Sequence, residues 1–219
     1  IESMRGLERL LRRFERHPYA VAAAGGLGLS VLFFFAGEEY AGLGLSTIDA
    51  SLEGTASVFA LAFLVKILAT AVTLETGGSG GIVTPIFFIG ATSGAALGQA
   101  LGLAPGVVAA FGFVSVLAAA ANTPIAAAVM GMELLPHDLG VYAALCAGTA
   151  FLMVGHRSVY ASQKLGLAKS GGLEVPVDVP IGEVRTGGMR IRPGSLTESV
   201  LGELERGVRK GVRGRRRSR

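Results

Sequence analysis

The chain has 219 residues, of which 51% are hydrophobic and 16% are charged, with 33 glycines and a mean hydropathy of +0.56. So few charges exclude an ordinary soluble enzyme and are typical of a protein that crosses a membrane several times. A single cysteine excludes an intrachain disulfide. No metal or cofactor is expected, because no two of the three histidines have metal-ligand helical spacing: His17, His137 and His156.

Residues 1–17 are predicted to be the end of an earlier helix followed by a basic cytoplasmic arm. Arginines recur from Arg5 to Arg16, and no signal-peptide pattern is present. Pro18 to Gly37 carries no charge and is long enough to cross the hydrocarbon layer, so it is the first predicted crossing. A short outer helix is predicted from Gly42 to Leu52.

The second predicted crossing, Gly54 to Glu75, is interrupted by Lys66. A charge at this depth is costly, so Lys66 either pairs with a carbonyl or an acid, or lends positive potential to an anion path. Glu75 has two interpretations, a hydrated loop acid or a gating carboxylate at the pore mouth. At about 100° per residue the two side chains lie on opposite faces of a helix and form no ion pair.

A glycine-rich break from Gly77 to Pro85, reading GGSGGIVTP, interrupts a segment that has no charged residue between Thr76 and Met132. Non-helical backbone at membrane depth survives only when it is buried in protein or lines a polar cavity. A helix starting near Ile82 presents amide groups without intrahelical partners and the positive end of its dipole, which together attract anions. The expected donors are the N–H groups of Ile82 and Val83, and Gly81 permits close approach because it has no Cβ.

The third predicted crossing runs from Ile82 to Gly102. Every fourth residue of it is a glycine, and this stripe is predicted to pack closely against another helix: Gly90, Gly94, Gly98 and Gly102. Pro105 to Leu135 is too long for one straight pass, and we expect two shorter helices divided at Asn122-Thr123-Pro124, with an N-cap and a helix-starting proline.

Leu139 to Gly155 is the sixth predicted crossing, which places both basic flanks on the cytoplasmic side of a plasma membrane of prokaryotic type. The membrane domain is therefore predicted to span residues 18–163. Residues 164–219 are predicted to be a largely disordered basic tail, extended at best from Leu173 to Pro180, with a short helix from Leu196 to Val208. Its basic end suits an anionic membrane face, and nucleic acid is not an expected partner because no nucleic-acid-binding module accompanies it.

Three segments resemble one membrane-protein family. Gly81-Ile82-Val83-Thr84-Pro85 is similar to the G-x-F-x-P anion-site motif of the CLC family of chloride channels and chloride/proton antiporters. Leu117 to Leu134 resembles the paired short helices before that family's last membrane span. Gly155 to Tyr160 resembles the segment whose tyrosine hydroxyl faces the central anion. The match covers residues 7–162.

This resemblance implies an all-α polytopic membrane protein of tilted and broken helices, one half of a CLC-type inverted-repeat fold. It implies transport of chloride, bound by Gly81, the amides of Ile82 and Val83 and the hydroxyl of Tyr160. Val83 stands where the family usually has phenylalanine. A homodimer through residues 124–154 is implied, as is a missing N-terminal half of the same protein, since the family's serine motif and gating glutamate are absent here.

Several alternatives stay open from the sequence. The chain does not distinguish a channel from a proton-coupled antiporter, nor chloride from fluoride. A non-transporting, dimer-forming fragment is a further alternative. Gly77-Gly78-Ser79-Gly80 also fits the G-x-S-G pattern of rhomboid-like intramembrane serine proteases, but that interpretation needs a histidine at membrane depth, and His137 and His156 lie at the ends of spans. An enzyme is therefore not expected.

Overall fold

The computed structural model describes residues 2–11, 17–55, 61–164, 169, 173–174, 178–182, 190–191 and 193. The chain divides into two compact units, residues 1–159 and 160–219, and each is described by itself. The predicted helix at 196–208 and the basic segment 209–219 lie outside the described residues.

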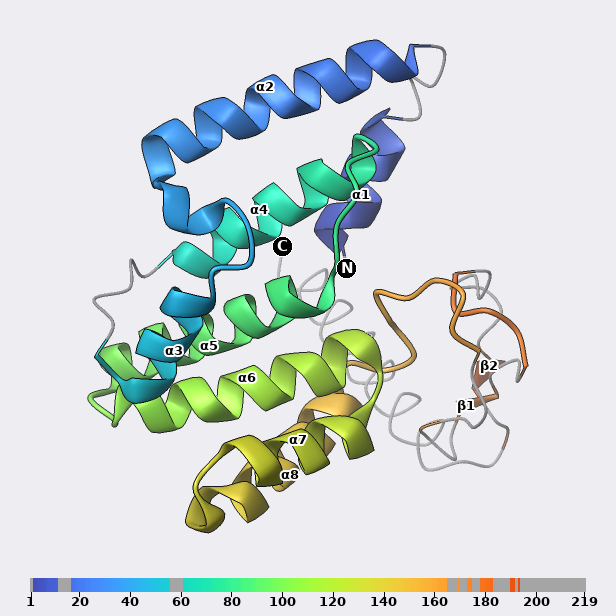
Figure 1. The fold of residues 1–219 in the computed structure, drawn as a ribbon. Helices are drawn as coiled ribbons and strands as arrows, with labels where there is room; N and C mark the ends of the chain where they lie inside the picture. The colour runs from blue at the N-terminus through green and yellow to red at the C-terminus, as the bar shows by residue number, and fades with distance from the viewer. Residues whose placement is uncertain are drawn as a thin grey trace, which may run out of the picture. The chain divides into compact units, whose positions relative to one another are not determined.

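The regular elements described in the first unit are all helical, as predicted (Figure 1). A short 3₁₀ turn, η2, joins two of the helices. The bounds are α1 Glu2–Leu11, α2 Pro18–Ala36, η2 Glu38–Tyr40, α3 Leu45–Glu53, α4 Ala62–Glu75, α5 Val83–Leu101, α6 Pro105–Ala121, α7 Pro124–Leu134 and α8 His137–Met153.

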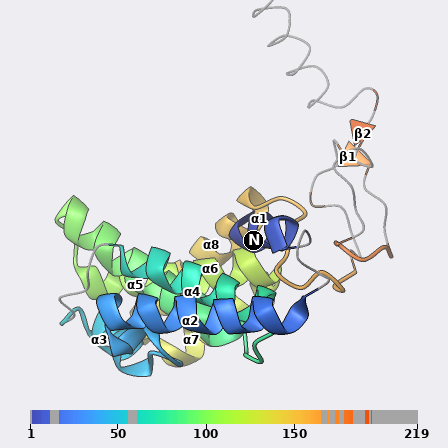
Figure 2. The same cartoon turned by 90° about the horizontal axis from the view of Figure 1, so that it is seen from above.

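The helices of this unit stack in the order α2, α4, α5 and α6, followed by the α7–α8 pair (Figure 1). In the view from above, α2 runs from one side of this group of helices to the other (Figure 2). The core lies where α5 and α6 meet their neighbours, and it includes the fully buried side chains of Phe88 and Val114. α5 is thus a central helix of the unit.

The second predicted crossing is longer than the helix that forms. α4 begins at Ala62, and Gly54 instead closes α3 in a left-handed conformation, with φ 72° and its N–H directed to the carbonyls of Ala50 and Ser51. Glycine adopts this conformation at no steric cost, so Gly54 ends the earlier helix and does not begin the next.

The predicted division into two helices at Asn122-Thr123-Pro124 is confirmed, with Thr123 as the N-cap residue of α7. Asn122 is the C-cap of α6, with φ 59° in the left-handed region, and Pro124 occupies the first turn of α7. Asparagine tolerates this conformation better than most residues, and proline fits the first helical turn because its missing N–H is not needed there.

Among the described helices, α2 is the one long and apolar enough, by length and composition, to cross a membrane. α6, α7 and α8 are apolar but shorter. α2 buries only Gly25, while Tyr19 and Phe34 are 89% and 83% exposed. An apolar helix with outward-facing large side chains needs lipid or further protein around it. The six predicted crossings stay a prediction.

Three members of the glycine stripe bring α5 and α6 into backbone contact. A Cβ at Gly90 would lie 2.6 Å from the carbonyl oxygen of Gly112, and a Cβ at Gly98 would lie 2.9 Å from Cα of Pro105. Gly94 similarly faces the backbone of Val108. Gly102 has a different place from the one predicted, because it is the left-handed C-cap of α5 and a Cβ there would meet nothing within 4 Å.

The second unit contains a small antiparallel pairing of β1 (Leu173–Glu174) with β2 (Arg190–Ile191). Leu173 lies opposite Ile191, and Lys164 forms an isolated bridge with Pro180. β1 falls within the segment predicted to be extended. The unit begins at Tyr160, whereas the predicted tail begins at residue 164.

We predict that Gly90→Ala destabilises the protein by about 1–3 kcal/mol, because the new methyl group must force the α5 and α6 backbones apart. The melting temperature in detergent measures this effect. Gly26→Ala, on α2, is the matched control, since a Cβ there meets nothing within 4 Å. Equal melting temperatures for the two variants would contradict the close-contact account.

Candidate functional site at the glycine break

The first two glycines of the break terminate α4. The N–H of Gly78 donates to the carbonyl of Thr73 at 2.8 Å, and the N–H of Gly77 donates to that of Leu74 at 3.3 Å. Gly77 has φ 90°, and Thr76 is the C-cap. These two bonds form a Schellman motif, which satisfies carbonyls that the helix end leaves unpaired. Gly77 and Gly78 therefore serve the helix that precedes the site.

α5 begins at Val83, with Ile82 as its N-cap residue and no side-chain cap bond among the described residues. The N–H of Ile86 donates to the carbonyl of Ile82 at 3.2 Å, and Pro85 has no N–H to offer. The amides of Ile82, Val83 and Thr84 precede this bond, so no carbonyl of the helix itself pairs with them. The sequence-based expectation named only Ile82 and Val83, although the amide of Thr84 is also among the first unpaired donors of the helix.

A cavity of about 330 Å³ adjoins the break. Three of its lining residues belong to the connection into α5 and one to the first turn of α5, while the others come from α2, α4 and the turn that follows α2: Ser79, Gly80, Gly81, Pro85, Phe33, Lys66, Ala69, Thr70, Thr73, Leu74, Tyr40, Ala41, Gly42 and Leu43. A Cβ at Gly80 or Gly81 would meet nothing within 4 Å. A side chain at either glycine would therefore have open space around its Cβ.

The predicted anion-binding residues are distributed around this helix start. Gly81 lines the cavity, whereas Ile82 and Val83 do not. The Ile82 side chain packs against a buried cluster that includes Ile86 and Leu117, and Val83 is 41% exposed. Any contribution of Ile82 and Val83 to ion binding therefore comes from their backbone.

Tyr160 is the first residue of the second unit, and it is 37% exposed. The residue before it is anchored in the first unit, where the N–H of Val159 donates to the carbonyl of Ala120 at 2.8 Å. Val159 packs against the same cluster as Ile82. Val159 is therefore held by the same cluster as the side chain of Ile82.

Lys66 is only 2% exposed, and its contacts come from outside its own helix. Nζ donates to the carbonyl of Tyr40 at 3.1 Å and to that of Gly42, and it lies 5.0 Å from the centroid of the Phe88 ring. The predicted pairing with backbone carbonyls is confirmed. Glu75 is half-buried at the last position of α4, outside the lining of the cavity.

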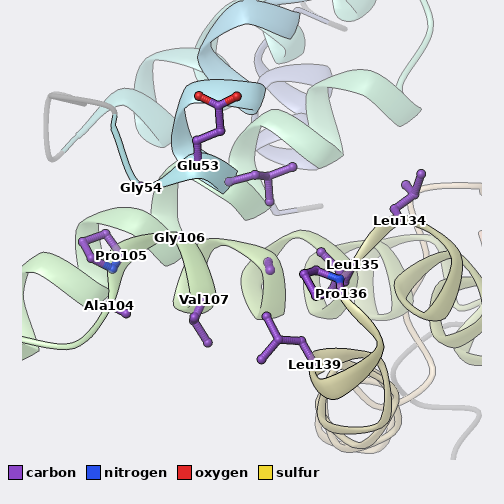
Figure 3. Close-up of a pocket in the computed structure, with 12 residues that line it drawn as sticks. Glu53, Gly54, Ala104, Pro105, Gly106, Val107, Leu134, Leu135, Pro136 and Leu139 are labelled. Carbon is purple, nitrogen blue, oxygen red and sulfur yellow. The ribbon is translucent and has the colours of Figure 1, made fainter.

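A second cavity, of about 490 Å³, lies at the N-terminal end of α6 and is largely apolar (Figure 3). Pro105, Pro136 and Leu139 are among the residues that line it, together with Glu53. In Figure 3 the Glu53 carboxylate points away from Leu139. The part of its lining that the structure describes includes no basic side chain, so this cavity offers less to an anion than the cavity beside Lys66.

The chain is similar to several known proteins. The family model described as voltage gated chloride channel matches residues 1–155. A chloride/fluoride channel protein of Pseudomonas syringae pv. tomato is 38% identical over 170 residues, which are 74% of this chain and 36% of that protein. An uncharacterized protein of Methanocaldococcus jannaschii is 32% identical over 149 residues, 65% of this chain and 37% of that protein.

The crystal structure of a CLC-type fluoride/proton antiporter superposes with a TM-score of 0.67 at 28% sequence identity. The match covers 72% of this chain and 40% of the antiporter chain. The chain thus spans well under half the length of the proteins that it matches.

We predict that Gly77→Ala destabilises the protein by about 1–2 kcal/mol, because an L residue with a side chain must adopt the left-handed conformation to keep the Schellman bonds. The melting temperature in detergent is the measurement. Gly80→Ala is the control, since its Cβ meets open space and its φ lies outside the left-handed region. A greater loss for Gly80→Ala than for Gly77→Ala would contradict the separate roles given to the two glycines.

Proposed function

The chain belongs to the voltage-gated chloride channel (CLC) family, and we propose that it supplies the part of a membrane anion transporter in which the start of α5 holds the ion. Members of this family are channels and transporters, so the interpretation of Ser79 as the nucleophile of a rhomboid-like protease is wrong. Membership also implies an integral membrane protein. The cytoplasmic position of both termini stays a prediction.

The observation that carries the proposal is the start of α5 beside the cavity. The amides of Ile82, Val83 and Thr84 precede the first intrahelical bond, and the adjoining Gly81 leaves room for close approach. The helix dipole adds roughly half a positive charge at this end. Amide donors hold an anion without a full counter-charge, which suits a site that must also release its ion.

Tyr160 is proposed as a hydroxyl donor to the same ion. The support is the resemblance of Gly155 to Tyr160 to the family's tyrosine segment. Backbone amides and one hydroxyl supply only part of an ion's coordination shell. We therefore propose that further ligands and the gate come from residues outside this chain.

The proposed ion is a small halide, with fluoride as a specific candidate beside chloride. The Pseudomonas relative is named as a chloride/fluoride channel protein, and the solved antiporter is named for fluoride and protons. Each hydrogen bond from an amide to fluoride is stronger than one to a larger halide, because the charge of fluoride is concentrated in a smaller volume. Flux measured for both ions decides between them.

We also propose a homodimer through residues 124–154, with lipid around the remaining apolar surface. α7 and α8 carry many exposed apolar side chains, several of them over 60% exposed: Ile125, Leu134, Val141, Leu145, Leu152 and Met153. Val141, Leu145 and Leu152 lie on one face of α8, because their spacing of four and seven residues brings them to the same side of a helix. This face suits a second copy of the chain. If dimer formation were the whole role of the chain, the alternative of a dimer-forming segment without transport would apply.

We predict that Tyr160→Phe and insertion of one glycine between Gly80 and Gly81 each lower anion binding about tenfold or more, since a hydrogen bond to a charged group contributes about 1.5–3 kcal/mol. The measurements are chloride and fluoride flux from liposomes containing the intact protein, and calorimetric ion binding in detergent.

Tyr19→Phe is the control for the tyrosine change, because Tyr19 is 89% exposed on α2 and is not among the described residues that line the cavity. It should leave flux and binding unaltered. Unchanged flux and unchanged binding in both the Tyr160→Phe and the insertion variants would refute the proposed site. Absence of flux in the unmodified protein would favour the dimer-forming alternative.

For the dimer, we predict that Leu145→Trp reduces association about tenfold, because a larger side chain in a packed interface costs about 1–3 kcal/mol. Chemical cross-linking in liposomes measures the dimer fraction. Leu27→Trp on α2 is the matched control, at 70% exposure against 65% for Leu145. An equal effect of both changes would place the interface elsewhere.

A further inference from the structure

Lys66 is a buried cation without a described anionic partner. Its ammonium group donates to two backbone carbonyls and faces one aromatic ring, and within the described residues no carboxylate forms an ion pair with it. Carbonyl oxygens and the face of a ring both attract a cation, but neither carries a net negative charge. One full positive charge therefore remains at a side chain that is 2% exposed.

Such a charge is costly in apolar surroundings unless a counter-charge lies near it. The ammonium has three N–H donors, of which the two carbonyls of Tyr40 and Gly42 take two. The 3₁₀ turn and the residues that follow it thus hold Nζ in place and leave one donor unassigned. Lys66 also lines the 330 Å³ cavity, so the third N–H group is available to a ligand in that cavity.

The cavity has further groups that suit an anion. Thr70 and Ser79 line it, and neither hydroxyl has a hydrogen-bond partner among the described residues. The Thr73 hydroxyl, in contrast, already donates to the carbonyl of Ala69 at 2.8 Å. Among the described residues that line the cavity there is no aspartate or glutamate, so none of them offers a carboxylate to a cation. Since a water molecule occupies about 30 Å³, the volume admits a small anion with several waters.

We propose that this cavity is a second anion-binding site, in which Lys66 Nζ and the hydroxyls of Thr70 and Ser79 hold a partly hydrated monovalent anion. It is distinct from the amides of α5, because neither Ile82 nor Val83 lines it, but Gly80 and Gly81 border both places. This inference rests on the proposed function only in assigning the same small halide to the cavity. The site raises the halide concentration beside the helix start.

The test is the crystal structure of the intact protein in bromide, whose anomalous scattering locates the ion. We expect a bromide peak in the cavity within hydrogen-bond distance of Lys66 Nζ. Lys66→Met should abolish the peak, and Lys66→Arg should keep it, because arginine retains the charge. No peak in the unmodified protein, or a peak that survives Lys66→Met at full height, would overturn the proposal.

A second pair of variants covers the case in which Lys66→Met fails to fold. Gly80→Asp places a carboxylate at the cavity wall, where a Cβ meets nothing within 4 Å, and Gly80→Asn places an amide of nearly equal size there. We expect the aspartate to reduce bromide occupancy at least tenfold and the asparagine to keep it. Equal occupancy in the two variants would contradict an electrostatic site at this place.

Flux separates this inference from the proposed function. If the cavity concentrates halide, Lys66→Met raises the half-saturating halide concentration about tenfold while flux at saturation changes much less, as expected when only local ion concentration falls. Absence of flux from the unmodified protein, with the bromide peak present, defeats the proposed function and leaves the cavity site standing. Normal flux with no peak in the cavity defeats the cavity site alone.

Discussion

The backbone contact between α5 and α6 is the interaction on which the rest of the first unit depends. Gly90 and Gly112 lie so close that a single Cβ at Gly90 would collide with a carbonyl oxygen. Apolar side chains gain little from meeting one another in lipid, so close packing of small residues must hold such helices together. This contact sets the direction of α5, and α6 in turn provides the carbonyl of Ala120 on which Val159 docks.

The glycine break has two functions, and the sequence of Gly77 to Pro85 alone does not show which glycine serves which function. Gly77 and Gly78 complete the end of α4, whereas Gly80 and Gly81 leave space beside the start of α5. A helix end needs a left-handed residue and satisfied carbonyls, and an ion site needs open access to unpaired amides. Both the helix end and the ion site lie in one short connection, because few residues separate the end of α4 from the start of α5.

Lys66 illustrates how a costly residue becomes part of a site. Its carbonyl partners at Tyr40 and Gly42 are 26 and 24 residues away in the chain, and its aromatic neighbour Phe88 belongs to the core. The ammonium therefore ties α4 to the turn after α2 and lies at the wall of the cavity. A structural role and an electrostatic role are compatible, since dipoles and a ring orient a charge without cancelling it.

The sequence by itself determined the helical class, the helix start after the glycine break and the division before Pro124, because helix ends follow from local backbone chemistry. It also identified the family, through three motifs whose order and spacing survive without coordinates. Only the tertiary structure decided that Gly102 caps α5, that Gly81 borders a cavity while Ile82 does not, and which carbonyls Lys66 contacts. Those facts depend on segments distant in the chain, whose approach is set by packing and not by local propensity.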